Sequence, residues 1–162
     1  MEHDDQTGPG PDDAHEIAQQ ADVELSILLG IERTLRVALQ WMTRGRGNSR
    51  KLSTLRFQMW TFKRHLTRLN VLSDHGGYLH VVTDAVSDLA GEVHVLRVKR
   101  TELHSDLNRT MLLMEHISQD DADGFARLCA DLEGFLDHLR SQGERERALV
   151  RQALARNQGG AE

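Results

Sequence analysis

Both prolines of the chain lie within its first eleven residues, so from Asp12 onward no proline interrupts the backbone. Proline is the residue that most strongly ends a helix. Good helix formers are plentiful in the same stretch, whereas the whole chain has seven aromatic residues (Phe 4, Trp 2, Tyr 1). A chain of 162 residues fits one domain. The sequence therefore predicts a single all-α domain.

Three polar, glycine-containing breaks divide the chain into four segments, at residues 43–51, 74–77 and 118–124. Within each segment, apolar residues alternate spacings of three and four and so form one helical seam. Four helices joined by short connections pack most simply as an up-down-up-down antiparallel four-helix bundle. We predict that residues 14–156 form this bundle. Residues 1–13 are expected to be a disordered acidic tail, and residues 157–162 a frayed C-terminus.

Polar residues interrupt these apolar seams. Glu32, Ser73, Gln142 and Glu146 stand at seam positions otherwise held by Leu, Met, Phe and Ala, and the third seam is broken at Arg100. A buried carboxylate needs a partner, because an unpaired charge costs several kcal/mol in a core. Counting residues from the connections places Glu32, His104 and Gln142 at similar depths in the bundle. We therefore expect one polar layer, in which His104 or water links Glu32 to Glu146.

The second segment ends in Leu69-Asn-Val-Leu-Ser73-Asp-His-Gly-Gly-Tyr78-Leu. This stretch resembles the second helix of bacterial hemerythrin-like (HHE cation-binding) domains, in which a His-x-x-x-Glu pair is followed closely by Gly-Gly-Tyr-Leu. About residues 15–155 can be laid on the family's pattern. The resemblance implies a four-helix bundle. It also implies two iron atoms held by histidines and carboxylates from all four helices, with oxygen binding, iron handling or gas sensing as the usual activities.

The family's ligand positions fall, in chain order, on Glu32, Leu69, Ser73, His104, Gln142 and Glu146. Leu69 and Ser73 replace the His-x-x-x-Glu pair and offer nothing comparable to imidazole and carboxylate. The tentative residual metal set is therefore Glu32, His104 and Glu146. We expect a degenerate site with no cofactor, in a non-enzymatic binding, regulatory or structural protein. One alternative is a protein that binds iron or another divalent metal in an altered site, for oxygen, gas or iron sensing. A second alternative is an adaptor that binds nucleic acid or an acidic partner through the basic segment 33–68.

A second metal set avoids the lost positions. Glu32, His65, His104 and His138 could supply one carboxylate and three imidazoles, which is a zinc-type complement. His65 and His138 adjoin seam residues rather than occupying the seam. They are therefore expected to flank a helix interface and to face partly outward.

Charge is distributed in blocks, although the net charge is only −5. Residues 33–73 carry ten Lys or Arg and no acid. Four of these cations, Arg44, Arg46, Arg50 and Lys51, form a candidate polyanion-binding group, with aromatic residues nearby. The alternative is that the aromatics plug the bundle end and the arginines pair with the acidic later helices. We favour this second interpretation, so nucleic acid is not the expected partner; an acidic or other protein partner and the oligomeric state stay open.

Cys129 is the single cysteine, so the chain forms no internal disulfide and no cysteine-based metal site. No apolar stretch is long enough for a membrane span, and the acidic N-terminus is unlike a signal peptide. We therefore expect a cytoplasmic protein without membrane association. The glycine-rich phosphate loop and the Gly-x-Ser-x-Gly elbow do not occur, which removes support for the catalytic classes that depend on them.

Overall fold

A computed structural model describes residues 11–40, 47–73, 77–85, 87–118 and 120–159. These residues contain no strand, and the all-α prediction is confirmed. The helices are α1 (Pro11–Gln40), α2 (Gly47–Ser73), α3 (Tyr78–Ala85), the 3-10 turn η1 (Ser87–Leu89), α4 (Ala90–His116) and α5 (Ala122–Gly159).

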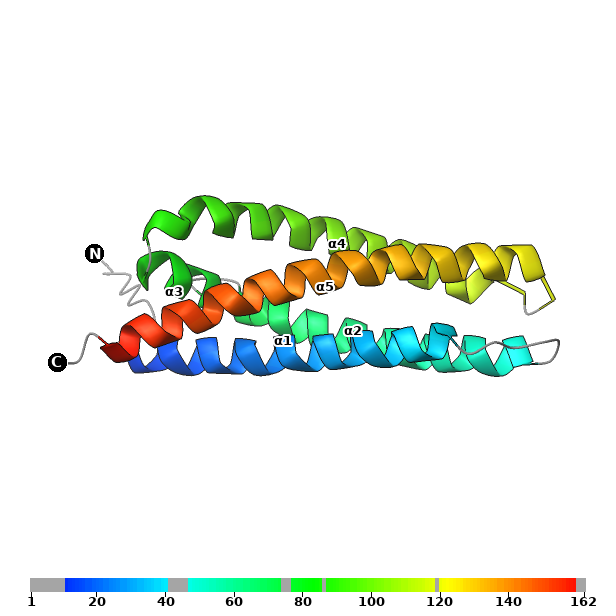
Figure 1. Cartoon of the computed structure of the whole chain (residues 1–162), viewed down its shortest axis with the longest axis horizontal. Helices are drawn as coiled ribbons and strands as arrows, with labels where there is room; N and C mark the ends of the chain where they lie inside the picture. Colours follow the sequence, from blue (N-terminus) through cyan, green and yellow to red (C-terminus); the bar gives the residue numbers. More distant parts are fainter. Residues whose placement is uncertain (1–10, 41–46, 74–76, 86, 119, 160–162) are drawn as a thin grey trace, which may run out of the picture.

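The four long helices α1, α2, α4 and α5 extend along a common long axis, with the short α3 at the end where α2 finishes and α4 begins (Figure 1). α1 packs against α2 and α5, and α4 packs against α5 and α2. Ion pairs fix the relation of α1 to α5. Asp22 lies 2.9 Å from Arg147 and Asp137 lies 2.7 Å from Arg36, so the two helices are antiparallel.

The core follows the predicted seams closely. Each predicted seam position of α1 up to Leu39 is buried, and the same holds for α2 from Leu52 to Leu69. Phe62 of α2 and Phe135 of α5 meet edge to face, with ring centroids 5.7 Å apart. Two of the polar seam residues, Ser73 and Gln142, are half-buried. Met42, the last predicted seam residue of the first segment, lies outside the described residues.

The helix boundaries differ from the expected ones at several places. The expected third helix is divided into α3, η1 and α4, and α5 begins at Ala122, inside the expected third break. α1 begins at Pro11, so the last three residues of the expected tail are helical; proline is favoured at a first helical position because its missing N–H is not needed there. α2 begins at Gly47, inside the expected first break. α5 continues to Gly159, past the expected fraying point. The remaining residues of the expected tail and C-terminus, 1–10 and 160–162, lie outside the described residues.

The connection from α2 to α3 depends on a glycine. A Cβ at position 77 would overlap the carbonyl oxygen of Leu72, so only glycine allows this close approach. The Gly77 carbonyl then accepts a hydrogen bond of 2.9 Å from the backbone N–H of His80, in the first turn of α3. Tyr78, the first residue of α3, is fully buried as a result.

Candidate functional site

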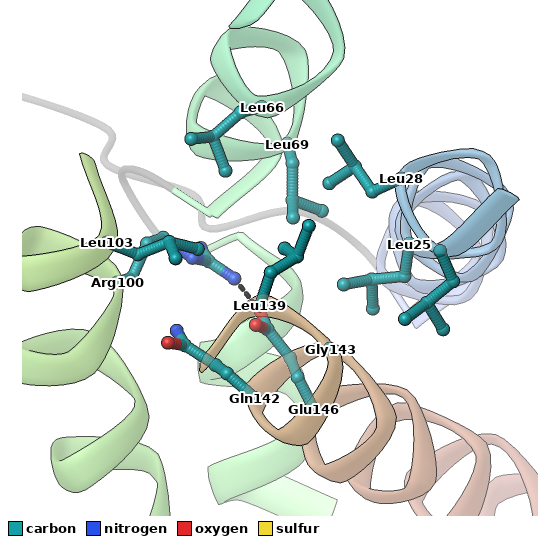
Figure 2. A pocket seen from close by; sticks show the side chains of 11 residues that line it. Leu25, Leu28, Leu66, Leu69, Arg100, Leu103, Leu139, Gln142, Gly143 and Glu146 are labelled. Carbon is teal, nitrogen blue, oxygen red and sulfur yellow. Dashed lines mark ion pairs between the residues drawn. The ribbon is translucent and has the colours of Figure 1, made fainter. Parts of the chain in front are cut away.

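A small cavity lies between the four long helices, at the level where α3 joins them. Its volume is about 10 Å³, close to the space that one water molecule needs. Figure 2 shows hydrocarbon side chains of α1 and α2 on one side of this space, and Arg100 approaching Glu146 from the other. The lining residues are Leu25, Leu28, Leu29, Leu66, Leu69, Arg100, Leu103, Leu139, Gln142, Gly143 and Glu146.

Arg100, Glu146 and Tyr78 form a buried network contributed by α4, α5 and α3. The Arg100 guanidinium makes an ion pair with the Glu146 carboxylate, and the Tyr78 hydroxyl donates a hydrogen bond to the same carboxylate oxygen. Arg100 also donates to the Tyr78 oxygen, and its guanidinium carbon lies 5.4 Å from the centre of the Tyr78 ring. The carboxylate therefore has both a charged and a neutral donor.

Burial decides the electrostatics of this network. Glu146 is 2% exposed and Arg100 is 7% exposed. Two such charges are tolerated in a core only when they are paired and hydrogen-bonded. Burial raises the pKa of Tyr78 well above its ordinary value near 10, although the nearby Arg100 acts in the opposite direction. The phenol is thus protonated at neutral pH and serves as a donor.

Gln142 borders the cavity and contacts the backbone of α4 rather than Glu146. The polar groups around its amide fit the orientation in which Nε2 donates to the Lys99 carbonyl at 3.2 Å and Oε1 accepts from the Arg100 N–H at 3.0 Å. The side chain therefore links α5 to the turn of α4 that carries Arg100. It does not present a free nitrogen to the cavity.

Glu32 belongs to a different polar cluster. It is 1% exposed and pairs with Arg36, four residues later on α1. Arg36 in turn donates to Asp137 of α5 at 2.7 Å. The hydrogen bond to Glu32, and then the one to Asp137, raise the pKa of Arg36. The carboxylate of Glu32 is thus neutralised within its own helix.

Glu32 and Glu146 are both buried, as predicted, but they do not share a layer. The α1–α5 pairs Asp22–Arg147 and Arg36–Asp137 place Glu146 opposite the part of α1 near Leu25. Glu32 lies roughly 10 Å further along the axis, at 1.5 Å per residue. Within α1 the cavity is lined by Leu25, Leu28 and Leu29. The expected single polar layer is therefore corrected to two separate clusters.

The structure does not bring the predicted metal ligands together. His104 is half-buried, and its Nδ1 is buried without a hydrogen-bond partner among the described residues, so it does not bridge the two carboxylates. His65 Nδ1 lies 2.7 Å from Glu24 Oε2, between α1 and α2, and His138 is exposed. Among the described residues, no group of three or more His, Cys, Asp or Glu is arranged to hold a metal ion.

The side chains at the two lost ligand positions on α2 are also not available to bind a metal ion. Leu69 is 1% exposed and lines the cavity with its hydrocarbon side chain. Ser73 donates from Oγ to the Asn70 carbonyl at 2.8 Å. With Glu146 already paired to Arg100, the residues present do not fit a di-iron centre.

The candidate polyanion group is only partly on the described surface. Arg44 and Arg46 lie outside the described residues, while Arg50 is exposed. Lys51 is buried instead, and its Nζ donates to the Leu39 carbonyl at 2.8 Å. Lys51 therefore satisfies a backbone acceptor of the last turn of α1.

The second interpretation of the basic segment was that its arginines pair with the later helices and its aromatic residues plug the bundle end. The structure agrees with only part of it. Arg36 does pair with an acid of a later helix, Asp137 of α5, at 2.7 Å. Arg56 instead donates from Nε to a backbone acceptor, the Met114 carbonyl of α4, at 2.9 Å. Phe57 and Trp60 do not plug the bundle end, because both are exposed. Trp41 lies outside the described residues.

Sequence reasoning missed Arg100 and Tyr78 as members of the polar site. Arg100 lies four residues after Leu96 and three before Leu103, which is a seam position. A cation on one seam is the natural partner of an acid on another seam. This signal could have identified Arg100, instead of His104, as the partner of Glu146. Tyr78 had a weaker signal, its place directly after two glycines.

No described helix combines the length and the apolar character that crossing a membrane requires. Comparisons of the chain with protein-family models, curated proteins and solved structures gave no match.

Proposed function

We propose that the chain is a divergent hemerythrin-like domain, an up-down-up-down antiparallel four-helix bundle whose metal site has been replaced by an internal ion pair. It works in the cytoplasm as a non-enzymatic binding, regulatory or structural protein. The resemblance at Leu69–Leu79 supports this proposal, as does the arrangement of the long helices around a small cavity that Arg100, Gln142 and Glu146 border.

One observation carries it. Three of the positions that the resemblance assigns to metal ligands, Leu69, Gln142 and Glu146, line the same cavity although they come from two different helices. In that cavity the carboxylate of Glu146 is neutralised by Arg100. A guanidinium remains charged at every physiological pH, so it supplies the positive charge that a metal ion would otherwise supply.

The chemistry of the cavity supports a non-enzymatic role. The carboxylate of Glu146 accepts from both Arg100 and Tyr78. The remaining lining is mostly leucine, and the cavity volume of about 10 Å³ leaves no room for a substrate. A site with this lining stabilises a fold and does not transform a ligand.

The test is the metal content of the protein purified aerobically without chelators. We expect well under one iron or zinc atom per chain, no visible absorption, and a melting temperature that EDTA does not change. The variant Glu146→Gln, which keeps the shape but removes the charge, should match the wild type in metal content. Two irons per chain with oxo-bridge absorption would refute the proposal and favour the altered-metal-site alternative.

A further inference from the structure

The outer face of α2 carries a row of exposed residues that points away from the bundle core. Alternate steps of four and three residues separate its members, which are Ser53, Phe57, Trp60, Arg64, Thr67 and Val71. We call this row the outer stripe. Phe57 is 67% exposed, Trp60 55% and Val71 69%. The stripe spans roughly 27 Å at 1.5 Å per residue, which is about five helical turns.

The charge of α2 has one sign. Its 27 residues contain no Asp or Glu. Arg64 lies within the outer stripe and is exposed, as are Arg50 and Arg68 beside it. Arg68 also lies 3.9 Å from the Glu24 carboxylate of α1. Lys63 holds its Nζ 5.4 Å from the centre of the Trp60 ring, which is a cation–π contact. The large aromatic side chain is thereby positioned before any partner arrives.

Spacing and residue types together define what could cover this surface. Steps of four and three residues are those by which one α-helix packs along another. Aromatic residues and arginine are the types that dominate binding energy at protein interfaces. A covering helix would place apolar side chains on Phe57, Trp60 and Val71. It would place carboxylates opposite Arg64 and the flanking cations.

The same features count against other occupants. A second copy meeting this face with its own α2 would oppose arginine to arginine. A bilayer would have to accommodate the Arg64 guanidinium and the Thr67 hydroxyl within the face that inserts Phe57. For a nucleic acid, no recognised binding motif accompanies these cations in the sequence.

We propose that the outer stripe of α2 docks an acidic amphipathic helix of a partner protein. The surface is separate from the cavity, so the inference goes beyond the proposed function and does not depend on whether the core holds a metal. A partner helix with apolar residues at heptad spacing and Glu or Asp beside them has the required chemistry.

The experiment uses the full chain and a fluorescein-labelled probe peptide of about 20 residues, with Leu at heptad a and d positions and Glu at e and g. We expect saturable binding, followed by fluorescence anisotropy, that weakens as salt is raised. The double variant Phe57→Ser/Trp60→Ser should bind at least about tenfold more weakly, and Arg64→Glu should do the same.

Matched controls use the outer face of α1, where Val23 and Val37 are exposed to similar degrees (57% and 53%) without a basic helix around them. The double variant Val23→Ser/Val37→Ser should bind the peptide as the wild type does. A probe with Lys in place of Glu should not bind. Because all the substituted residues are exposed, circular dichroism should show unchanged helicity for each variant.

Four results would overturn the proposal. The first is no binding of the acidic probe, and the second is equal weakening by the α1 control variant. The third is tighter binding to a single-stranded oligothymidylate or to phosphatidylserine vesicles than to the probe. The fourth is wild-type self-association, seen by analytical ultracentrifugation, that Phe57→Ser/Trp60→Ser abolishes; this result would assign the face to a second copy of the chain.

Discussion

Arg100 of α4 and Glu146 of α5 form an ion pair in which the side chains are 9% and 2% exposed. The desolvation of two such charges offsets most of their attraction, so the pair adds little net stability compared with well-packed apolar residues. Removing one member should nevertheless lower the free energy of unfolding strongly, because the other charge is then left unpaired in the core.

Replacing Arg100 by Leu should therefore lower the free energy of unfolding by about 3 to 5 kcal/mol. The double variant Arg100→Leu/Glu146→Leu should lose clearly less than Arg100→Leu alone, because it leaves no stranded charge. Urea unfolding followed by circular dichroism measures both. As a control, Arg109→Leu removes an exposed partner of Asp106 and should change stability by under about 1 kcal/mol. Equal losses for the single and double variants would show that Glu146 is reached by water.

Tyr78 should make the protein sensitive to alkaline pH. Its pKa is raised in the folded state by burial, so its contribution is present below the ordinary tyrosine pKa of about 10 and is lost above it, as the unfolded chain ionises. Tyr78→Phe should be less stable than the wild type at pH 7. Above pH 10 its free energy of unfolding should fall less steeply with pH, and the two slopes should differ by up to about 1.4 kcal/mol per pH unit.

Unfolding curves between about pH 8 and pH 12 measure this difference in slope. Burial also raises the pKa of the Cys129 thiol, which gives a second alkaline loss of the same sign. Both proteins are therefore compared in a Cys129→Ala background. If the free energy of unfolding falls equally with pH in the proteins with Tyr and with Phe at position 78, the Tyr78 hydroxyl is not buried.

His104 should matter little for stability. Its buried Nδ1 has no hydrogen-bond partner among the described residues, so replacing it by Leu strands no other group. We expect His104→Leu to change the free energy of unfolding by under about 1 kcal/mol, measured by urea titration. A loss as large as that of Arg100→Leu would restore His104 as a bridge between buried carboxylates.

Building a metal site should require the loss of Arg100. The residues that line the cavity suggest the quadruple variant Leu28→His, Leu69→His, Arg100→His and Gln142→His, with Glu146 retained. We expect this variant to bind Zn²⁺ or Fe²⁺ and to melt at a higher temperature when metal is added. The quadruple that follows from the hemerythrin-like resemblance keeps Arg100 and should gain neither property. Its substitutions are Glu32→His, Leu69→His, Ser73→Glu and Gln142→His. Metal binding by this second quadruple alone would favour the ligand positions of the resemblance over those of the observed cavity.

Two glycines of α5 should respond differently to alanine. At Gly134 an added Cβ meets no atom within 4 Å, so Gly134→Ala should stabilise the helix by about 0.5 to 1 kcal/mol. At Gly143 the added Cβ would lie 3.2 Å from Leu29 Cδ2, which must shift to make room. Gly143→Ala should therefore gain less than Gly134→Ala, as thermal unfolding would show. An equal gain at both positions would mean that the Leu29 side chain shifts without cost.

The three-and-four spacing of apolar residues depends on helix geometry alone, so it was sufficient to predict much of the core. It did not predict the buried residues Tyr78, Leu79 and Val82 of α3. Leu25, Phe62, Leu107 and Leu132 are each buried where the seams placed them. It was not sufficient to predict the relative levels of the helices. Glu32 seemed level with the residues around Gln142 because the connections at one end were assumed to lie at one depth.

The helices in fact end at different levels. The α1–α5 ion pairs place Gln40, the last residue of α1, opposite the region near residue 132, about ten residues after α5 begins at Ala122. A stagger of this kind depends on how side chains interlock, and spacing within one helix does not encode it. For the same reason, periodicity alone identified Arg100 only as a break in the third apolar seam and did not identify it as the partner of Glu146.

The two buried carboxylates differ in when their charge can be neutralised. Glu32 has its counterion four residues away, so α1 can form this contact while it is still an isolated helix. Glu146 has to wait for Arg100 and Tyr78, which arrive from α4 and α3. We therefore expect α3 and α4 to dock on α5 together, because detachment of α4 would leave the Glu146 charge on α5 without its counterion.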